Sequence, residues 1–158
     1  MRKLRAQNWL LSLVMVLTAA VWLAGPVPAF AADTPPTPAP AQVSLNTKYP
    51  VLSGESGDSF NFDVDMSYTG TDKQKFAVSV APPAGWTATA TTSTGKQAAV
   101  IELGPADSFP ASEFLSVSLS PPATKSPDPG DYKVTLTVDS GAYKQSIDLT
   151  ARVTARYG

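Results

Sequence analysis

The sequence predicts an all-β protein in which two antiparallel sheets pack face to face. The stretch Phe60–Tyr68 has an apolar side chain at every second position and a polar one between them, which is the pattern of a strand with one buried face. Further alternating stretches follow, and the turns between them are rich in glycine and proline. No window shows a sustained helical period. A strand with a single apolar face needs a second sheet to cover it, so the pattern favours a sandwich.

We expect about seven to nine strands between residues 43 and 157, at the spacing of a sandwich. Residues 43–48 are expected to form a first strand at an edge, and residues 52–58 a polar turn before the central strand. Four strand-like stretches follow, at residues 75–81, 86–92, 97–103 and 113–120. The alternation predicts that these side chains point inward: Phe76, Val78, Val80, Ala99, Ile101, Leu103, Leu115, Val117 and Leu119.

The last two strands are predicted to form a hairpin. Residues 132–138 and 147–153 alternate between apolar and polar side chains, with a glycine-containing turn at residues 140–141 between them. We interpret Arg152 and Arg156 as exposed charges on an edge strand, where they discourage the addition of another strand. Tyr132 is predicted to lie in the core, with its hydroxyl bonded to the main chain as in a tyrosine corner.

The first 31 residues have the pattern of a secretory signal peptide. An apolar run over residues 9–24 is followed by the small-x-small sequence Ala29-Phe30-Ala31, and the run is preceded by the basic residues Arg2, Lys3 and Arg5. We expect cleavage after Ala31, because the run is shorter than the roughly 20 residues that cross a bilayer. An uncleaved N-terminal membrane anchor is the alternative. In either case we expect the rest of the chain outside the cytoplasm, secreted or in a bacterial cell envelope.

Residues 32–42 are expected to form a disordered linker. Their four prolines favour an extended conformation and remove main-chain donors, so this segment cannot join a sheet. Residues 43–158 then make one folded domain, which is a typical domain length. Nothing apolar follows the last predicted strand, so we expect no transmembrane helix after signal cleavage.

The composition excludes several classes of function. The chain contains neither cysteine nor histidine, so a Ser-His-Asp triad, a cysteine nucleophile and the usual zinc sites are absent. Its formal net charge is −1, and removal of the basic signal segment makes the remainder more acidic. Nucleic-acid binding depends on a clustered positive face. We therefore expect no nucleic-acid partner.

Two pairs of carboxylates are candidates for chemistry. Asp63 and Asp65 share the polar face of the central strand, and paired carboxylates can hydrolyse glycosidic bonds. Asp128 and Asp131 flank a Pro-Gly turn, and oxygen-rich loops can hold calcium. A solvated strand face and ordinary turn chemistry explain both pairs without a ligand. Gly95-Lys96 lacks the spacing of a phosphate-binding loop. We predict no catalytic, cofactor-binding or metal-binding residues, with calcium as the alternative.

Three aromatic residues are candidates for ligand binding, namely Trp86, Tyr49 and Tyr143. An exposed aromatic ring can stack on a sugar, whereas a large ring beside a turn can also cover one open end of a sandwich. For Trp86 we favour the covering role, because tryptophan is largely buried in most proteins.

Three motifs resemble those of a known family. They are Gly57-Asp58-Ser59-Phe60 with the later Tyr68-Thr69-Gly70, then Pro82-Pro83-Ala84-Gly85-Trp86, and finally Gly130-Asp131-Tyr132-Lys133-Val134. At this spacing the chain resembles the NEW3 domain over residues 43–153. NEW3 is an immunoglobulin-like module found beside α-galactosidase catalytic domains and in bacterial and archaeal envelope proteins. The resemblance implies an immunoglobulin-like sandwich without catalytic activity of its own, accessory to glycan-acting enzymes or envelope transport systems.

The functional hypothesis is a non-catalytic binding or scaffolding module outside the cytoplasm. Its expected partner is an extracytoplasmic protein or an envelope glycan, and we expect a monomer. The alternatives are a carbohydrate-binding module, which needs a planar patch of exposed aromatic rings, and a small glycan hydrolase that uses carboxylates. Hydrolysis needs two carboxylates that face each other across a groove, about 5 to 9 Å apart. Without either feature, contact with a protein through an exposed strand edge is the default expectation.

Overall fold

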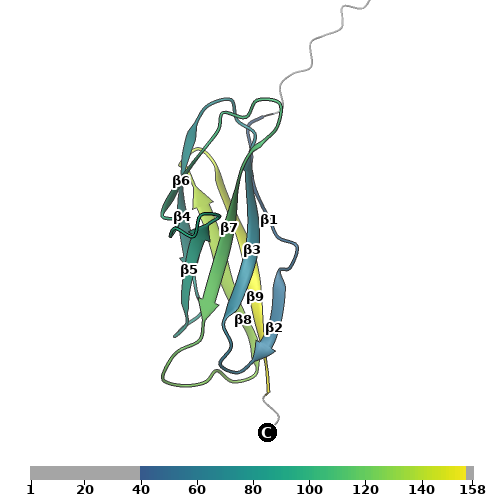
Figure 1. The fold of residues 1–158 in the computed structure, drawn as a ribbon, viewed down its shortest axis with the longest axis vertical. Coiled ribbons are helices and arrows are strands. Elements are labelled where there is room, and N and C mark those ends of the chain that lie inside the picture. The colour runs from purple at the N-terminus through teal and green to yellow at the C-terminus, as the bar shows by residue number, and fades with distance from the viewer. Residues whose placement is uncertain (1–39, 156–158) are drawn as a thin grey trace, which may run out of the picture. The chain divides into compact units, whose positions relative to one another are not determined.

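The computed structural model describes residues 40–155, which contain nine strands and no helix (Figure 1). The strands are β1 Val43–Asn46, β2 Val51–Glu55, β3 Phe60–Tyr68, β4 Gln74–Ala81, β5 Thr87–Thr92, β6 Val100–Leu103, β7 Ala111–Ser120, β8 Gly130–Asp139 and β9 Lys144–Thr154. Within this part of the chain, nothing helical is long and apolar enough to cross a membrane. The predicted signal peptide, most of the predicted linker and Arg156 lie outside the described residues.

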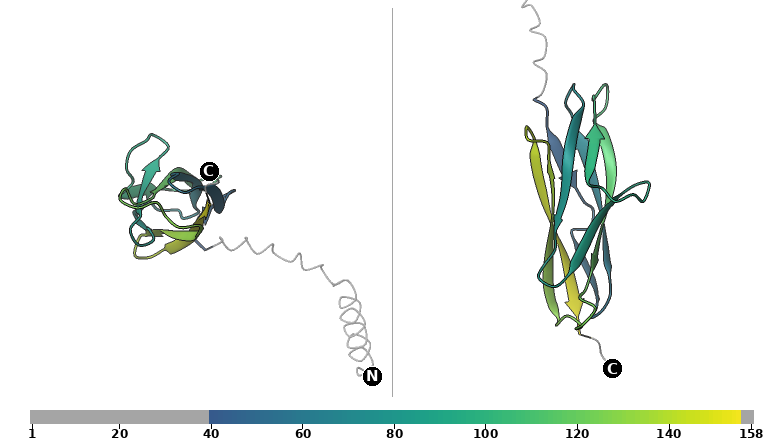
Figure 2. Two further views of the ribbon diagram at one scale, coloured as in Figure 1. Left: turned by 90° about the horizontal axis from the view of Figure 1, so that it is seen from below. Right: turned by 90° about the vertical axis from the view of Figure 1, so that its left-hand side faces the viewer.

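The nine strands form two sheets that pack into a sandwich, as the sequence predicts (Figures 1 and 2). One sheet has the order β1-β3-β7-β5, and the other has the order β2-β9-β8-β4-β6. All pairings are antiparallel except that of β2 with β9, which is parallel. The arrangement is an immunoglobulin-like β-sandwich.

Alternate residues of the long strands fill the space between the sheets. Along β3 every second side chain from Phe60 to Tyr68 is buried, and Asn61, Asp63 and Asp65 between them are exposed. The predicted inward residues of β4 and β7 are buried or pack against the core. Burial of each such large apolar side chain stabilises the fold by roughly 1.5–3 kcal/mol. The buried side chains form one continuous core.

The predicted polar turn at residues 52–58 is wrong for residues 52–55, because β2 occupies Val51–Glu55 and the turn follows it. Ser53 and Gly54 have the composition of a turn, but here they pair with β9. A β-carbon on Gly54 would lie 3.0 Å from the ring of Phe60. Gly54 therefore marks the place in β2 where the Phe60 side chain approaches the main chain, and it does not mark a turn. The first strand also ends earlier than expected, at Asn46.

A second correction concerns the predicted strand at residues 97–103. The observed strand β6 is Val100–Leu103, and the predicted inward residue Ala99 is exposed while Ala98 is buried. The chain changes sheets here: the amide of Ala98 donates to the carbonyl of Ala90 in β5, and the carbonyl of Ala99 accepts from Val78 in β4. This crossing interrupts the alternation of inward and outward side chains. The alternation seen in β6 therefore does not apply to residues 97–99.

Both lateral edges of the sandwich are thus made by chain segments that change sheets. At one edge, β1 pairs with β3 and then β2 pairs with β9. At the other, residues 96–98 bond to β5 before β6 pairs with β4. At the first edge, β1 pairs with only part of β3 and β2 pairs with only part of β9. This partial pairing determines which main-chain groups of β3 and β9 stay exposed.

Candidate functional site

The ring of Trp86 is enclosed at the end of the sandwich where β3 and β8 begin. Trp86 is 5% exposed, and its ring centroid lies 4.7 Å from that of Tyr132 and 6.3 Å from that of Phe60. Its backbone amide donates to the carbonyl of Pro83, which holds the turn before β5. The ring covers the core and presents no face to solvent.

Tyr132 forms the tyrosine corner that the sequence predicts. Its ring packs against the core, and its hydroxyl donates a 2.8 Å hydrogen bond to the main-chain carbonyl of Asp128, four residues earlier. This bond ties the loop before β8 to the strand. It thereby fixes the end of the sandwich that Trp86 covers.

Tyr143 lies at the opposite end of β3 from Trp86. Its ring meets the ring of buried Tyr68 edge-on, with centroids 5.6 Å apart, and Tyr68 also packs edge-on against Phe76. Burial raises the pKa of the Tyr68 hydroxyl, and the neighbouring Tyr143 and Asp72 raise this pKa further. Tyr143 is partly buried against the core, so part of its side chain remains accessible.

Tyr49 is the most accessible of the three candidate aromatic residues. It follows β1 and is 56% exposed, and the ammonium of Lys48 lies 5.4 Å from its ring centroid. Because Trp86 contacts the start of β3 and Tyr143 contacts its end, the three residues do not form one aromatic surface.

The candidate carboxylates do not converge. Asp63 and Asp65 lie side by side on the exposed face of β3, opposite Ser116 and Phe114 of β7. Asp128 pairs with Lys125, and Asp131 accepts two hydrogen bonds from Arg152, at 2.7 and 2.9 Å. These bonds lower the pKa of Asp131. Residues 40–155 contain no group of three His, Cys, Asp or Glu side chains that could hold a metal ion.

The interpretation of Arg152 as an edge charge is wrong. β9 lies between β2 and β8, and the guanidinium of Arg152 reaches across to Asp131 of β8. The error follows from the misread segment at residues 52–58, since β2 is the strand that covers this part of β9. The same face carries further ion pairs between β8 and β9, namely Lys133–Asp148 and Lys144–Asp139.

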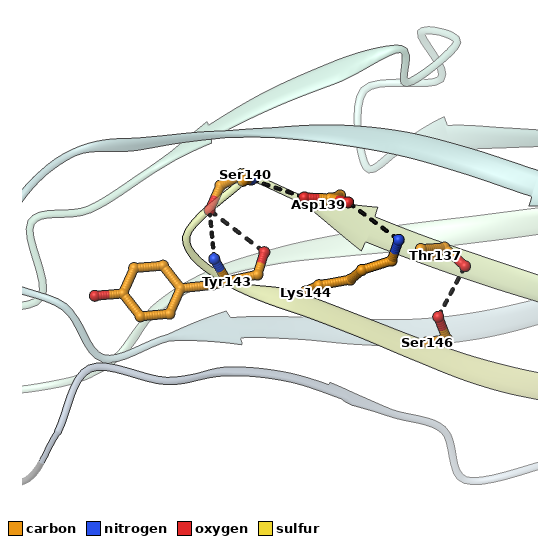
Figure 3. A network of polar contacts seen from close by, with 7 residues as sticks. Thr137, Asp139, Ser140, Tyr143, Lys144 and Ser146 are labelled. Atoms are coloured by element: carbon orange, nitrogen blue, oxygen red, sulfur yellow. Dashed lines mark hydrogen bonds and ion pairs between the residues drawn. The ribbon is translucent and has the colours of Figure 1, made fainter.

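The hairpin between β8 and β9 is held by a network of polar contacts (Figure 3). The carbonyl of Tyr143 accepts from the amide of Ser140, and the Ser140 hydroxyl accepts from the amide of Tyr143. A carboxylate oxygen of Asp139 accepts from Gly141 at 2.7 Å, and Lys144 pairs with the same carboxylate. These contacts fix the turn and hold the start of β9 in place.

An open hollow of about 510 Å³ lies beside this hairpin, between the sheets. It is lined by residues 41–44 on one side and 142–145 on the other. Gln42, at the end of the predicted linker, already belongs to the fold here, because its carbonyl accepts from the amide of Thr69. Tyr143 is a candidate from the sequence, but no sequence pattern indicates the hollow, which depends on how β1 and β9 approach each other.

A second open hollow, of about 470 Å³, lies at the end of the molecule that Trp86 covers. Its lining is largely the proline-rich loop at residues 121–127, together with Gly57 and Ser59. The hydroxyl of Ser56 donates to the carbonyl of Pro127 and ties this loop to the turn before β3.

The fold and its surface define an immunoglobulin-like β-sandwich domain. No protein-family model matches the sequence, and no curated protein matches it. Among solved structures, a family 123 glycoside hydrolase from Clostridium perfringens is similar, with a TM-score of 0.50 and 9% identity over 74% of this chain. The chain spans 28% of the length of that hydrolase.

Two smaller solved structures are also similar. The FixG-related protein from Vibrio parahaemolyticus has 10% identity and a TM-score of 0.49, over 73% of this chain and 98% of that one. The PapD-like domain 7 of human CEP192 has 12% identity and a TM-score of 0.47, over 84% of this chain and 100% of that one. At these identities the similarity concerns the fold alone.

Proposed function

We propose that the chain is a non-catalytic module of the bacterial cell envelope that binds another extracytoplasmic protein. The observation that carries this proposal is the convergence of the three motifs that resemble NEW3. Phe60 comes from the first motif, Trp86 from the second and Tyr132 from the third, and their rings pack into one cluster. Segments far apart in the sequence thus serve one structural purpose, which supports a NEW3-like domain and the accessory role that this family implies.

The surface also supports a binding module over an enzyme. The core is closed, and no buried polar or charged side chain is present in the described part of the chain. The two hollows are open to solvent, and neither is lined by an acidic side chain. Asp63 and Asp65 stand on one strand and line neither hollow, whereas glycoside hydrolysis needs carboxylates on both sides of the scissile bond.

Location outside the cytoplasm is part of the proposal and rests on the pattern of residues 1–31. Mass spectrometry of the full chain expressed in bacteria should show a product that begins at Ala32 and is found outside the cytoplasm. An intact N-terminus with membrane association would favour the anchor, and a cytoplasmic, uncleaved product would overturn the location.

The binding role is tested by crosslinking in the envelope of the cells that make the protein. Photoreactive residues placed at several exposed positions should give adducts with one and the same protein, while a glycan array incubated with the purified chain should remain without signal. Binding to the array without a protein adduct would replace the proposal with a carbohydrate-binding module. Release of sugar from an envelope glycan would show that the chain is an enzyme.

A further inference from the structure

The outer edge of β9 is covered along only half of its length. β2 pairs with residues 150–154 of β9, from Val51 opposite Thr150 to Glu55 opposite Thr154. Residues 144–149 pair with β8 on their other side, but no strand among the described residues pairs with their outer side. The cause is the change of sheet before β2, since β1 pairs with β3 of the other sheet.

The main-chain groups on this outer edge can be assigned. The amide of Thr150 donates to the carbonyl of Pro50, so the main-chain groups of Thr150 point away from β8. Alternate residues of a strand present their N–H and C=O groups to the same side. Lys144, Ser146 and Asp148 therefore point theirs outward as well. We call the main-chain groups of these three residues the open edge of β9.

The corresponding half-edge in the other sheet is partly covered. β1 pairs with residues 65–68 of β3 and leaves residues 60–64 without a partner on that side. There, however, the hydroxyl of Thr47 donates a 2.7 Å hydrogen bond to the carbonyl of Asp63. Within residues 40–155 no side-chain hydrogen bond of this kind reaches the open edge of β9, because the side-chain bonds of Lys144, Ser146 and Asp148 go to β8.

The hollow beside the hairpin lies at the start of this open edge. Val43 and Tyr143, which line it, both pack against the core, so the hollow has an apolar inner side. A strand added along β9 would place every second side chain toward this inner side and the intervening ones toward solvent. The polar contacts of Ser140 and Asp139 hold the edge in position before any partner binds (Figure 3), which lowers the entropic cost of binding.

The segment that precedes the domain is a poorer match for this edge than a partner protein. Residues 32–40 contain four prolines, and proline supplies no amide donor to a sheet. The exposed groups of the edge are main-chain donors and acceptors, whose natural partner is the main chain of an extended peptide. β2 already uses the same edge of β9 in this way, so an added segment continues an existing line of pairing.

We propose that the open edge of β9 binds an extended segment of a partner protein, which adds a strand beside residues 144–148 and places apolar side chains in the hollow beside Tyr143. The proposal rests on the proposed function, because it names the part of the surface that holds the partner. Affinity comes from the main-chain pairing, and preference comes from apolar side chains at every second position of the bound segment.

Hydrogen exchange of the free protein, measured by NMR on the purified chain, tests the edge itself. The amides of Ser146 and Asp148 should exchange rapidly, whereas those of Gln145 and Ile147, which face β8, should be protected. Protection of Ser146 and Asp148 in the free protein would mean that the edge is already covered and would overturn the proposal.

Selection from a phage-displayed library of random peptides tests the ligand. Enriched peptides should carry apolar residues at every second position and should slow exchange of the Ser146 and Asp148 amides. Ser146→Pro removes one outward amide at a position where a strand edge tolerates proline. Because one main-chain hydrogen bond to the peptide is lost, binding should weaken about fivefold. Ser146→Ala, which keeps the amide, should bind like the wild type.

Three results would overturn the proposal: no enriched peptide, enriched peptides that bind Ser146→Pro and the wild type equally, or a homodimer that Ser146→Pro dissociates. The last result would assign the edge to a second copy of the chain. These measurements use purified protein and do not depend on its location in the cell. The crosslinking experiment can therefore refute the proposed function without refuting peptide binding at the open edge, and the peptide experiments can do the reverse.

Discussion

The phenol of Tyr68 lies directly over Gly70, so close that a β-carbon on residue 70 would overlap the tyrosine hydroxyl. Tyr68 is 1% exposed and packs against Phe76 and Tyr143, so its ring has little freedom to move aside. The loop after β3 can therefore approach the core only because residue 70 has no side chain.

Gly70→Ala should destabilise the fold by about 1–3 kcal/mol, because the added methyl group overpacks a buried site. Urea denaturation of the purified protein, followed by circular dichroism, measures the free energy of unfolding. Thr71→Ala, at the exposed neighbouring position, is the matched control and should stay within about 0.5 kcal/mol of wild type. Equal stabilities for the two variants would show that Tyr68 does not lie over this loop.

The raised pKa of Tyr68 predicts a loss of stability at alkaline pH. A tyrosine whose pKa is higher in the folded than in the unfolded state keeps its proton longer when folded. Its contribution to stability is complete below the unfolded value of 10.0, and it declines as the pH rises from there through the higher pKa of the folded state. The free energy of unfolding should therefore fall more steeply above pH 10 in the wild type than in Tyr68→Phe.

Other groups that titrate at alkaline pH are common to both proteins, so the difference between the two curves isolates Tyr68. Thr71→Ala, at an exposed position without a titrating group, provides the control and should follow the wild-type curve. Parallel curves for the wild type and Tyr68→Phe above pH 10 would contradict the prediction.

The sequence predicts the long strands well because their residues alternate without interruption. β3, β7 and β8 each place apolar side chains at every second position, and those side chains fill the core. The tyrosine corner at Tyr132 was also predictable, because it depends on one residue and the loop just before it. Structures of this kind depend only on residues that are close together in the sequence.

The two lateral edges could not be predicted in the same way. At both edges a short segment leaves one sheet and joins the other, so that the hydrogen bonds of Ala98 and Ala99 go to different sheets. Gly54 is a strand residue because it pairs with β9, and it lacks a side chain where Phe60 of β3 lies against it. The candidate site follows from these edges, since the outer side of residues 144–149 is open only because β2 begins its pairing at Thr150.

Tyr132→Phe tests the tyrosine corner. The variant keeps the aromatic ring beside Trp86 and loses only the hydrogen bond to the carbonyl of Asp128. A typical hydrogen bond contributes about 0.5–1.5 kcal/mol, so the free energy of unfolding should fall by about 1 kcal/mol in urea denaturation. The variant should also raise the protease sensitivity of the loop at residues 121–129, which the bond ties to β8. An unchanged stability together with an unchanged cleavage pattern would show that the bond contributes nothing.

Asp131 and Arg152 predict how stability responds to acid. Hydrogen bonds from Arg152 lower the pKa of Asp131 below its usual 3.8. A carboxylate with a lowered pKa stabilises the fold above its unfolded value, and this contribution disappears as the pH falls below 3.8 and through the lower folded pKa. Asp131→Asn should therefore lose less stability than the wild type between neutral pH and pH values below 3.8. The two side chains are about half exposed, so added salt should reduce this difference, and a difference that grows with salt would contradict an ion pair.

Trp86→Ala should have the largest effect of these substitutions, because the ring joins β3, the turn before β5 and the start of β8. Removal of a buried tryptophan costs about 3–5 kcal/mol, and here it also leaves Phe60 and Tyr132 without the ring between them. Urea denaturation followed by circular dichroism measures the change in the free energy of unfolding. Tryptophan fluorescence is unsuitable, because the substitution removes the tryptophan of residues 40–155. Thr89→Ala, on the exposed side of β5, should change stability by less than about 0.5 kcal/mol. If Trp86→Ala unfolds at the same urea concentration as Thr89→Ala, Trp86 does not cover the core, and the convergence of the three motifs loses its structural meaning.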